Sequence, residues 1–271
     1  MTLDEATRLL AEAGIENPRG EARLLLAHAL GVSRDKTLTA GELKPGQAEH
    51  YAELVKRRLK REPLAYITRW REFWSLDFHV GPGVLVPRPD TETLIEEALR
   101  LVPDRKAALR IADLGTGSGA ILIAALTEFP NATGIGFESS EDAFNFAFHN
   151  AAMYVPGRGE IRLADWAIAE GPFDLVFCNP PYIPAGDIES LAPDVSRYEP
   201  RAALDGGEEG LDAYRELAGL LPRILVPGGY TLLEIGLGQA NAVEPLFPNL
   251  EIVRIAPDLG GILRCLVLRK V

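Results

Sequence analysis

The residues Asn179-Pro180-Pro181-Tyr182 follow directly on the apolar run 173–178. That run predicts a buried strand, and open α/β sheets bind ligands at the carboxyl ends of their strands. The Asn179 side-chain oxygen and the Pro180 carbonyl could each accept one N–H of a planar NH₂ group. Pro180 and Pro181 would stiffen the turn, while Tyr182 could pack on a flat substrate group. The motif indicates methyl transfer to an amide or exocyclic amine nitrogen, although a rigid turn without a ligand would need the same residues.

A glycine-rich turn supplies a second candidate site, with the sequence Asp113-Leu114-Gly115-Thr116-Gly117-Ser118-Gly119. Glycines let the backbone turn sharply and let a ligand approach main-chain N–H groups at a helix N-terminus. Gly115, Gly117 and Ala120 satisfy the loose dinucleotide fingerprint, and the three glycines fit the S-adenosylmethionine loop equally well. The turn alone therefore predicts a nucleotide-like cofactor without deciding which one.

Two further positions fit a cofactor of either kind. Glu138 ends the strand expected after the glycine turn, where its carboxylate could accept hydrogen bonds from both ribose hydroxyls. Asp165 and Trp166 follow the next strand and could offer an acceptor and an aromatic face to adenine, or only pack a loop. A hydride-transferring enzyme has no use for the motif at Asn179, so S-adenosylmethionine is the favoured reading.

The elements that must position these residues alternate between strand and helix after residue 108. Strands are predicted at 109–114, 133–138, 160–163, 173–178, 230–235, 251–256 and 263–269, and helices at 120–129, 141–153 and 211–225. This alternation predicts a mostly parallel, Rossmann-like sheet covered on both faces. The last two strands are too close in sequence for a helical crossover, which predicts an antiparallel edge strand.

The first part of the chain predicts a different architecture. Thr2 and Glu5 form a capping box, Asn17 and Pro18 start a second helix that Gly31 ends, and a third helix is expected over 46–61. We therefore expect a helical bundle over 1–72, a β-hairpin linker over 73–89 that turns at Gly81-Pro82-Gly83, and a catalytic domain over 90–271. That domain should open with a helix over 90–101.

Composition narrows the class of protein. The 271 residues carry a formal charge of −11, which divides into +1 for residues 1–90 and −12 for the remainder. An acidic catalytic half disfavours a nucleic-acid clamp. Basic residues of the first part gather at Lys56, Arg57, Arg58, Lys60, Arg61, Arg69 and Arg71, as a partner surface or simply a solvated helix face. We expect a cytoplasmic protein without a membrane segment, a secretory signal, a disulfide framework or a metal site.

Along almost its whole length the chain resembles the bacterial release-factor glutamine methyltransferases, the PrmC/HemK family. Besides the two motifs, the resemblance rests on the segments Glu62–Ile67, Arg71–Trp74, Val86–Glu92, Glu199-Pro200, Gly206-Gly207, Pro227–Gly229 and Asp258–Gly260. Segment 88–92 together with the helical N-terminal part is the most specific of these. Two positions depart from the family pattern: Arg69 stands where it usually has Gly, and Glu138 where it usually has Asp.

The resemblance implies a class I S-adenosylmethionine methyltransferase fold and methyl transfer to the N5 amide of the glutamine in the Gly-Gly-Gln loop of class I release factors. The cofactor, which leaves as S-adenosylhomocysteine, would be held by Asp113, the turn Gly115–Gly119, Glu138, Asp165, Trp166 and Asn179. Asn179 through Tyr182, with Arg88 and Glu92, would hold the glutamine, and the bundle would dock the release factor. Two alternatives stay open at this point: an N6-adenine or other nucleic-acid amino-methyltransferase, and a binding protein without turnover.

Overall fold

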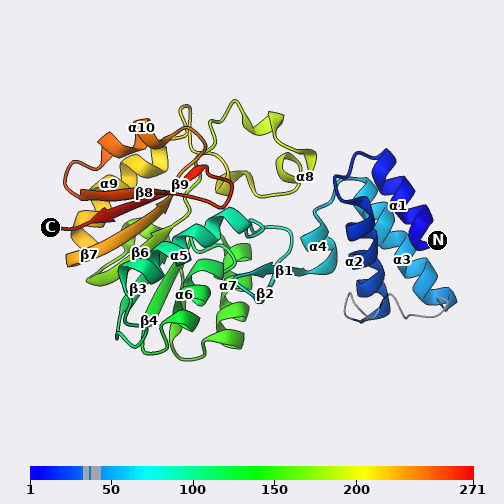
Figure 1. Cartoon of the computed structure of the whole chain (residues 1–271), viewed down its shortest axis with the longest axis horizontal. Coiled ribbons are helices and arrows are strands. Elements are labelled where there is room, and N and C mark those ends of the chain that lie inside the picture. The colour runs from blue at the N-terminus through cyan, green and yellow to red at the C-terminus, as the bar shows by residue number, and fades with distance from the viewer. Residues whose placement is uncertain (33–36, 38–43) are drawn as a thin grey trace. The chain divides into compact units, whose positions relative to one another are not determined.

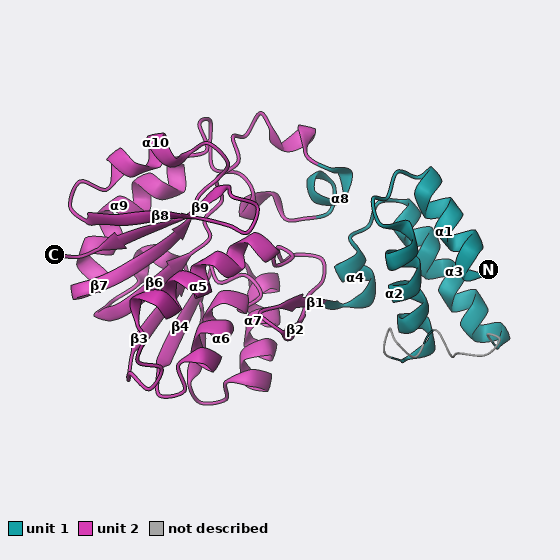
Figure 2. Cartoon of the chain, in the orientation of Figure 1, with its two compact units in different colours: residues 1–70, 192–198 teal, residues 71–191, 199–271 magenta. Residues whose placement is uncertain are grey.

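The computed structural model describes residues 1–32, 37 and 44–271. These residues form two compact units (Figure 2): Met1–Trp70 with Ala192–Tyr198, and Arg71–Leu191 with Glu199–Val271. The sequence placed a boundary at residue 72 and assigned all of 90–271 to the second unit. The structure instead gives the short excursion 192–198 to the first unit. No helix among the described residues is long and apolar enough to cross a bilayer.

The first unit is a helical bundle. Its helices are α1 (Leu3–Glu12), α2 (Pro18–Leu30), α3 (Pro45–Leu59), the short α4 (Leu64–Thr68) and, in the excursion, α8 (Pro193–Ser196). The predicted capping signals operate, because Thr2 and Glu5 form a reciprocal capping box and the Asn17 side chain accepts the Gly20 N–H. Fully buried Tyr51 donates its hydroxyl to the Ala22 carbonyl, 3.1 Å away, which satisfies the polar end of a core side chain.

A β-hairpin connects the units, but its turn differs from the prediction. Strands β1 (Trp70–Phe73) and β2 (Leu76–His79) pair as a two-stranded sheet. The hairpin turn lies at Trp74 and Ser75, with φ of 52° and 58°. The predicted turn at Gly81-Pro82-Gly83 also forms, but after the hairpin, where the Val84 N–H donates to the Gly81 carbonyl at 3.3 Å. Glu92 accepts the Trp74 backbone N–H at 2.7 Å, and the Trp74 indole donates to Glu128 at 2.8 Å. These long-range side-chain bonds support a left-handed turn that no local glycine signal marks.

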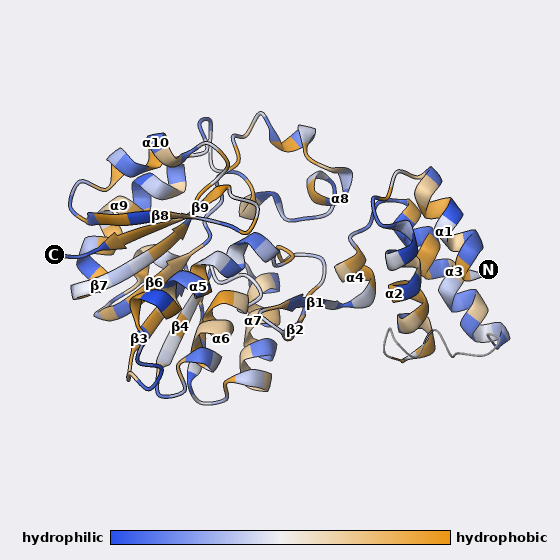
Figure 3. Ribbon diagram, in the orientation of Figure 1, coloured by the Kyte–Doolittle hydropathy of each residue, from blue (hydrophilic) through white to orange (hydrophobic). Residues whose placement is uncertain are grey.

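The second unit is built on a sheet in the order β5-β4-β3-β6-β7-β9-β8 (Figure 1). Its strands are β3 (Arg110–Leu114), β4 (Thr133–Glu138), β5 (Gly159–Leu163), β6 (Phe173–Cys178), β7 (Leu225–Glu234), β8 (Glu251–Pro257) and β9 (Leu263–Arg269). Strands β3 to β7 are mutually parallel, and β6 is among the strongly apolar segments (Figure 3). Strands β8 and β9 pair antiparallel, as their short connection requires. The strand that runs against the others is β9, which lies between β7 and β8, one strand in from the edge.

Helices cover both faces of this sheet (Figure 1). They are α5 (Glu92–Leu101), α6 (Ala120–Glu128), α7 (Glu141–Tyr154), α9 (Asp212–Ile224) and α10 (Ala240–Val243). Alternate residues of β3, such as Ala112 and Leu114, join Tyr214 and Leu217 of α9 in one core cluster. Asp113, between them, points to the opposite face, where it accepts the N–H of Leu122 in α6.

Strand register aligns the carboxyl ends of the central strands. Leu114 of β3 pairs with Phe137 of β4 and with Cys178 of β6. The residues that follow, Gly115, Glu138 and Asn179, therefore stand side by side in one row. From β3 the chain builds the sheet outward through β4 to β5 on one side, and it then returns to add β6 and β7 on the other side. Open α/β sheets bind ligands at such a change in strand order, here between β3 and β6.

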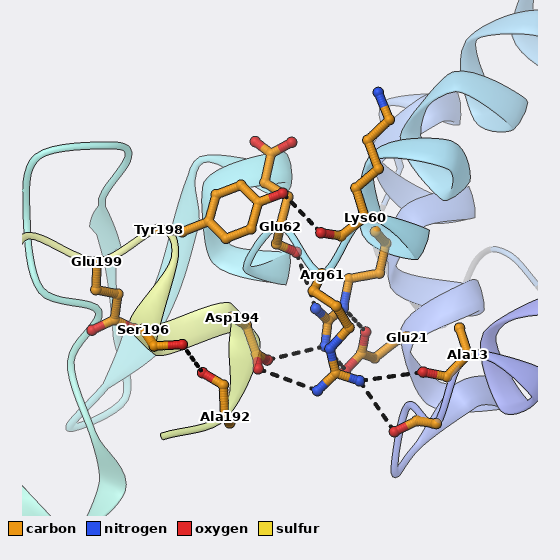
Figure 4. Close-up of polar contacts among 12 residues, drawn as sticks. Ala13, Glu21, Lys60, Arg61, Glu62, Ala192, Asp194, Ser196, Tyr198 and Glu199 are labelled. Atoms are coloured by element: carbon orange, nitrogen blue, oxygen red, sulfur yellow. Dashed lines mark hydrogen bonds and ion pairs between the residues drawn. The ribbon is translucent and has the colours of Figure 1, made fainter. Parts of the chain in front are cut away.

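The excursion 192–198 is attached to the bundle by charged side chains (Figure 4). Asp194 accepts from Arg58 at 3.3 Å and from Arg61 at 3.2 Å, and the Tyr198 hydroxyl donates to the Lys60 carbonyl at 2.8 Å. The Arg58 side chain is only 5% exposed. Much of the basic run therefore binds acidic groups of its own unit, and it is not simply a solvated helix face.

We expect Asp194→Ala to lower the free energy of unfolding by ~1–3 kcal/mol, because buried Arg58 then keeps only Glu21 as a carboxylate partner. Urea unfolding of the full chain followed by circular dichroism would measure the loss. Asp4→Ala is the matched control, because Asp4 pairs with Arg19 in solvent, with side chains 83% and 64% exposed respectively. This substitution should change the free energy of unfolding by less than ~0.5 kcal/mol. Equal effects of the two substitutions would contradict the role given to Asp194.

Arg69 ends α4 in the left-handed conformation, with φ of 70°. Its Cβ is strained there, so we expect Arg69→Gly to stabilise the chain by ~0.5–1 kcal/mol once the added chain entropy of glycine is subtracted. Arg69→Ala keeps the Cβ and should give no gain. Thermal unfolding of the three proteins decides this, and a gain from the alanine would show that the side chain, not the backbone, is the cause.

Candidate active site

A cavity of about 230 Å³ lies at the row of strand ends, lined entirely by the second unit. The sequence-predicted site residues that line it are Arg88, Gly115, Thr116, Gly117, Ser118, Glu138, Asp165, Trp166, Asn179 and Pro181. The predicted residues Asp113, Gly119, Pro180, Tyr182 and Glu92 are not among its lining. The structure thus brings the glycine turn, the acid after β4 and the start of the motif after β6 to one cavity.

The glycine turn is held by main-chain bonds to the neighbouring strand. The N–H groups of Gly115 and Thr116 both donate to the Phe137 carbonyl at 2.9 Å. Gly117, with φ of 58°, has nothing within 4 Å of the position that a Cβ would occupy, so a ligand can lie against its backbone. At Gly119 a Cβ would come within 3.0 Å of Ile123. Gly119 therefore allows close packing at the start of α6 and does not line the cavity.

Asp113 holds the glycine turn in place through side-chain hydrogen bonds. It is fully buried, and its Oδ2 accepts the Thr116 hydroxyl at 2.5 Å and the Leu122 N–H at 3.3 Å. Burial raises the pKa of this carboxyl to about 7. Its Oδ1 has no hydrogen-bond partner among the described residues. Asp113 therefore acts on the cavity through the turn that it supports.

Glu138 lies on the cavity wall and accepts two backbone N–H groups, from Gly117 to Oε2 and from Ser140 to Oε1, each at 2.9 Å. Burial raises its pKa, against the lowering effect of these bonds. A carboxylate has about four acceptor sites. Both oxygens therefore keep a free lone pair that could accept hydroxyl groups of a bound ligand.

Asp165 and Trp166 close another side of the cavity. Asp165 caps the turn η3 (Trp166–Ile168) by accepting the Ala167 N–H at 2.7 Å, and the Trp166 indole donates to Glu216 at 3.2 Å. The indole ring comes within 3.1 Å of the position of a Cβ on Gly115. A Cβ would be tight against this ring, and the φ of 71° at Gly115 also favours glycine. The cavity therefore has an aromatic face close to the turn, as adenine binding would need.

Asn179 presents its amide at the other end of the row. Its Nδ2 donates to the Thr91 hydroxyl oxygen at 3.4 Å. Tyr182 turns away from the cavity, since its hydroxyl donates to buried Glu234 at 3.1 Å and burial raises its pKa. This bond anchors the motif to β7, and packing of Tyr182 on a substrate stays a prediction.

Arg88 lines the cavity, and one guanidinium nitrogen donates to both carboxylate oxygens of Glu199, at 2.7 and 2.8 Å. The Glu199 side chain is only 2% exposed, so this ion pair fixes a positive group beside the motif. Glu92 instead accepts the Trp74 N–H and belongs to the hairpin turn.

Sequence reasoning assigned no role to Thr91, Glu199 or Glu234. Thr91 and Glu199 lie in segments that carried the family resemblance, and Glu234 directly follows an apolar strand run, which is a usable signal for a strand-end acid. Within the described chain, no group of three His, Cys, Asp or Glu side chains could hold a metal ion. Cys178 is fully buried, and burial raises its thiol pKa, which disfavours the nucleophilic thiolate.

The cavity would suit a nucleotide-like ligand, and the Asn179 side chain lies at its other end. A ligand would meet an open glycine backbone, an acidic acceptor and an aromatic face. The residues present thus fit S-adenosylmethionine. Next to it stands the Asn179 side-chain amide on a proline-stiffened loop.

Two family models match the chain, the PrmC N-terminal domain over residues 2–68 and the methyltransferase small domain over residues 91–193. The solved structure of a ribosomal protein L11 methylase from Lactobacillus delbrueckii subsp. bulgaricus is similar in fold. Its TM-score is 0.51 at 21% identity, covering 71% of this chain and 84% of that one.

Two curated relatives are similar over nearly the whole chain. The release factor glutamine methyltransferase of Rhodospirillum rubrum is 43% identical over 277 residues, 99% of this chain and 84% of that protein. That of Geobacter sulfurreducens is 44% identical over 256 residues, 90% of this chain and 86% of that protein. With the parallel sheet and the cavity described above, these matches make the chain a member of the release factor glutamine methyltransferase family, with a class I S-adenosylmethionine-dependent methyltransferase fold.

Proposed function

We propose that this enzyme transfers a methyl group from S-adenosylmethionine to the side-chain amide nitrogen of the glutamine in the Gly-Gly-Gln motif of class I peptide chain release factors, in the cytoplasm. The observation that carries the proposal is the row Glu138, Gly115 and Asn179 at one cavity. Family membership supports the same substrate, because the relatives bear that name.

The cofactor supplies an electrophilic methyl group on a sulfonium. Glu138 would accept hydroxyl groups of its ribose, the Gly117 backbone would pass beneath it, and Trp166 would face its adenine. Thr116 and Ser118 line the same side of the cavity. These contacts orient the cofactor without a metal.

Asn179 would hold the substrate amide. An amide nitrogen is a poor nucleophile, because its lone pair is delocalised. If the Asn179 oxygen and the Pro180 carbonyl each accept one N–H, the nitrogen is fixed with its face toward the methyl group. The same oxygens stabilise the positive charge that develops on nitrogen as the N–C bond forms and the methyl–sulfur bond breaks, so no general base is needed before transfer. The methylated nitrogen then loses one proton to water, and the sulfur leaves as the neutral thioether of S-adenosylhomocysteine.

Docking of the release factor is proposed for the helical bundle. The guanidinium groups of Arg58 and Arg61 already bind Asp194, and Arg57 binds Glu62. Docking would therefore use other bundle side chains. The −12 charge of residues 91–271 disfavours stable nucleic-acid binding, and we propose no membrane partner.

Incubation with methyl-labelled cofactor tests the function. The substrates are a release factor, the same factor with its Gly-Gly-Gln glutamine replaced, and bulk tRNA, rRNA and DNA. We expect label in the unaltered factor alone. Asn179→Ala should lower kcat by ~100-fold or more while leaving cofactor binding intact, because only the acceptor bonds are lost. Asn131→Ala, which removes an exposed amide bonded to Lys106, is the control and should match wild type. Label in nucleic acid, or normal turnover by Asn179→Ala, would refute the proposal.

Glu138→Gln tests the cofactor site separately. The substituted amide must turn its NH₂ toward one of the two backbone N–H groups, so we expect the Kd for S-adenosylmethionine to rise by ~10-fold or more in calorimetric titration. Because burial raises the Glu138 pKa, wild-type affinity should fall as the pH drops through that raised value, above the range where an exposed glutamate protonates. Glu141→Gln, on the exposed first turn of α7, is the control. An unchanged Kd for Glu138→Gln would remove Glu138 from the cofactor site.

A further inference from the structure

Glu234 stands beside Asn179 in the row of strand ends. Leu233 of β7 pairs with Cys178 of β6, so the residues that follow them, Glu234 and Asn179, are neighbours in register. Glu234 is only 1% exposed to solvent. Its Oε2 accepts the Thr91 hydroxyl at 2.6 Å, and its Oε1 accepts the Tyr182 hydroxyl at 3.1 Å. One buried carboxylate therefore connects to both ends of the motif 179–182, directly at Tyr182 and through Thr91 at Asn179.

The direction of these bonds decides which end of the Asn179 amide faces the cavity. The Thr91 hydroxyl has a single hydrogen, which it donates to Glu234. Its lone pairs therefore face Asn179 and can accept only a donor, which is the Nδ2 group at 3.4 Å. Turning the amide over would place Oδ1 against an oxygen with no hydrogen left. The chain thus uses the donor end of Asn179 internally and leaves the acceptor end for a ligand.

We propose that Thr91 and Glu234 are positioning residues that hold the Asn179 amide with its oxygen toward the substrate. The proposal rests on the function proposed above and deepens it, because it explains how the Asn179 side chain selects an NH₂ group. A site fixed as an acceptor binds amides and amines through their N–H groups. It rejects esters and carboxylates, which would leave Oδ1 facing another acceptor.

The test removes the Thr91 hydroxyl. Thr91→Val should lower kcat by ~10–100-fold, as loss of a supporting hydrogen bond behind a functional group typically does, while the Kd for S-adenosylhomocysteine stays within ~2-fold. Thr91→Ser keeps the hydroxyl and should restore most of the rate. Thr231→Val is the matched control, because Thr231 lies on the same strand as Glu234 and its buried hydroxyl has no hydrogen-bond partner among the described residues. Thr91→Ala serves the same purpose if the valine variant does not fold.

A double-mutant cycle separates positioning from direct substrate contact. If Thr91 acts through Asn179, Thr91→Val should change the residual rate of Asn179→Ala by less than ~2-fold. Additive losses in the cycle, or a wild-type rate for Thr91→Val, would overturn the proposal.

A readout without substrate keeps this proposal separate from the proposed function. In ¹⁵N-labelled full-length protein, the side-chain NH₂ signals of Asn179 are identified by their loss in Asn179→Ala. Thr91→Val should shift these signals, and Thr231→Val should leave them in place. If Thr91→Val leaves them unchanged, the positioning role is wrong. If wild type methylates no glutamine although the signals respond, the proposed function fails and the positioning role survives.

Discussion

The parallel register of β3 with β4 and β6, and of β6 with β7, is the constraint on which the site depends. Main-chain hydrogen bonds align Leu114, Phe137, Cys178 and Leu233, so each strand delivers its next residue to the same level of the sheet. Side chains alternate along a strand, and a slip by one residue would send every functional group to the opposite face. The buried apolar residues of these strands prevent that slip, so core packing fixes the geometry of the site.

Buried acids organise the strand ends. Asp113, Glu138 and Glu234 are each largely shielded from solvent, and burial raises the pKa of each. Their hydrogen-bond donors are mainly backbone N–H groups and hydroxyls, which hold neighbouring loops in one conformation. Asp113 holds the glycine turn, Glu138 joins that turn to the start of α7, and Glu234 anchors the amide motif. A buried carboxylate that lost one of these donors would be left without a hydrogen bond in a dry environment, which costs free energy. The loops that supply the donors are therefore held in one conformation.

The bundle uses its basic residues differently from what their clustering indicated. Arg58 and Arg61 hold the excursion 192–198, whose next residue, Glu199, binds Arg88 at the cavity. A run of basic residues shows only which charges are close to one another along the sequence. Asp194 lies far away in sequence, and therefore its pairing with these arginines could be found only in the folded chain.

The sequence by itself determined the helix caps at Thr2, Asn17 and Gly31, the strand and helix alternation, and the motifs at Gly115 and Asn179, because each depends on neighbouring residues or on periodicity. Only the tertiary structure decided the turn at Trp74, the bond that turns Tyr182 away from the cavity toward Glu234, and the roles of Thr91 and Glu234. These depend on hydrogen bonds between residues such as Thr91 and Glu234, which are 143 positions apart. Local propensity carries no information on such pairs, since packing of the sheet is what brings them together.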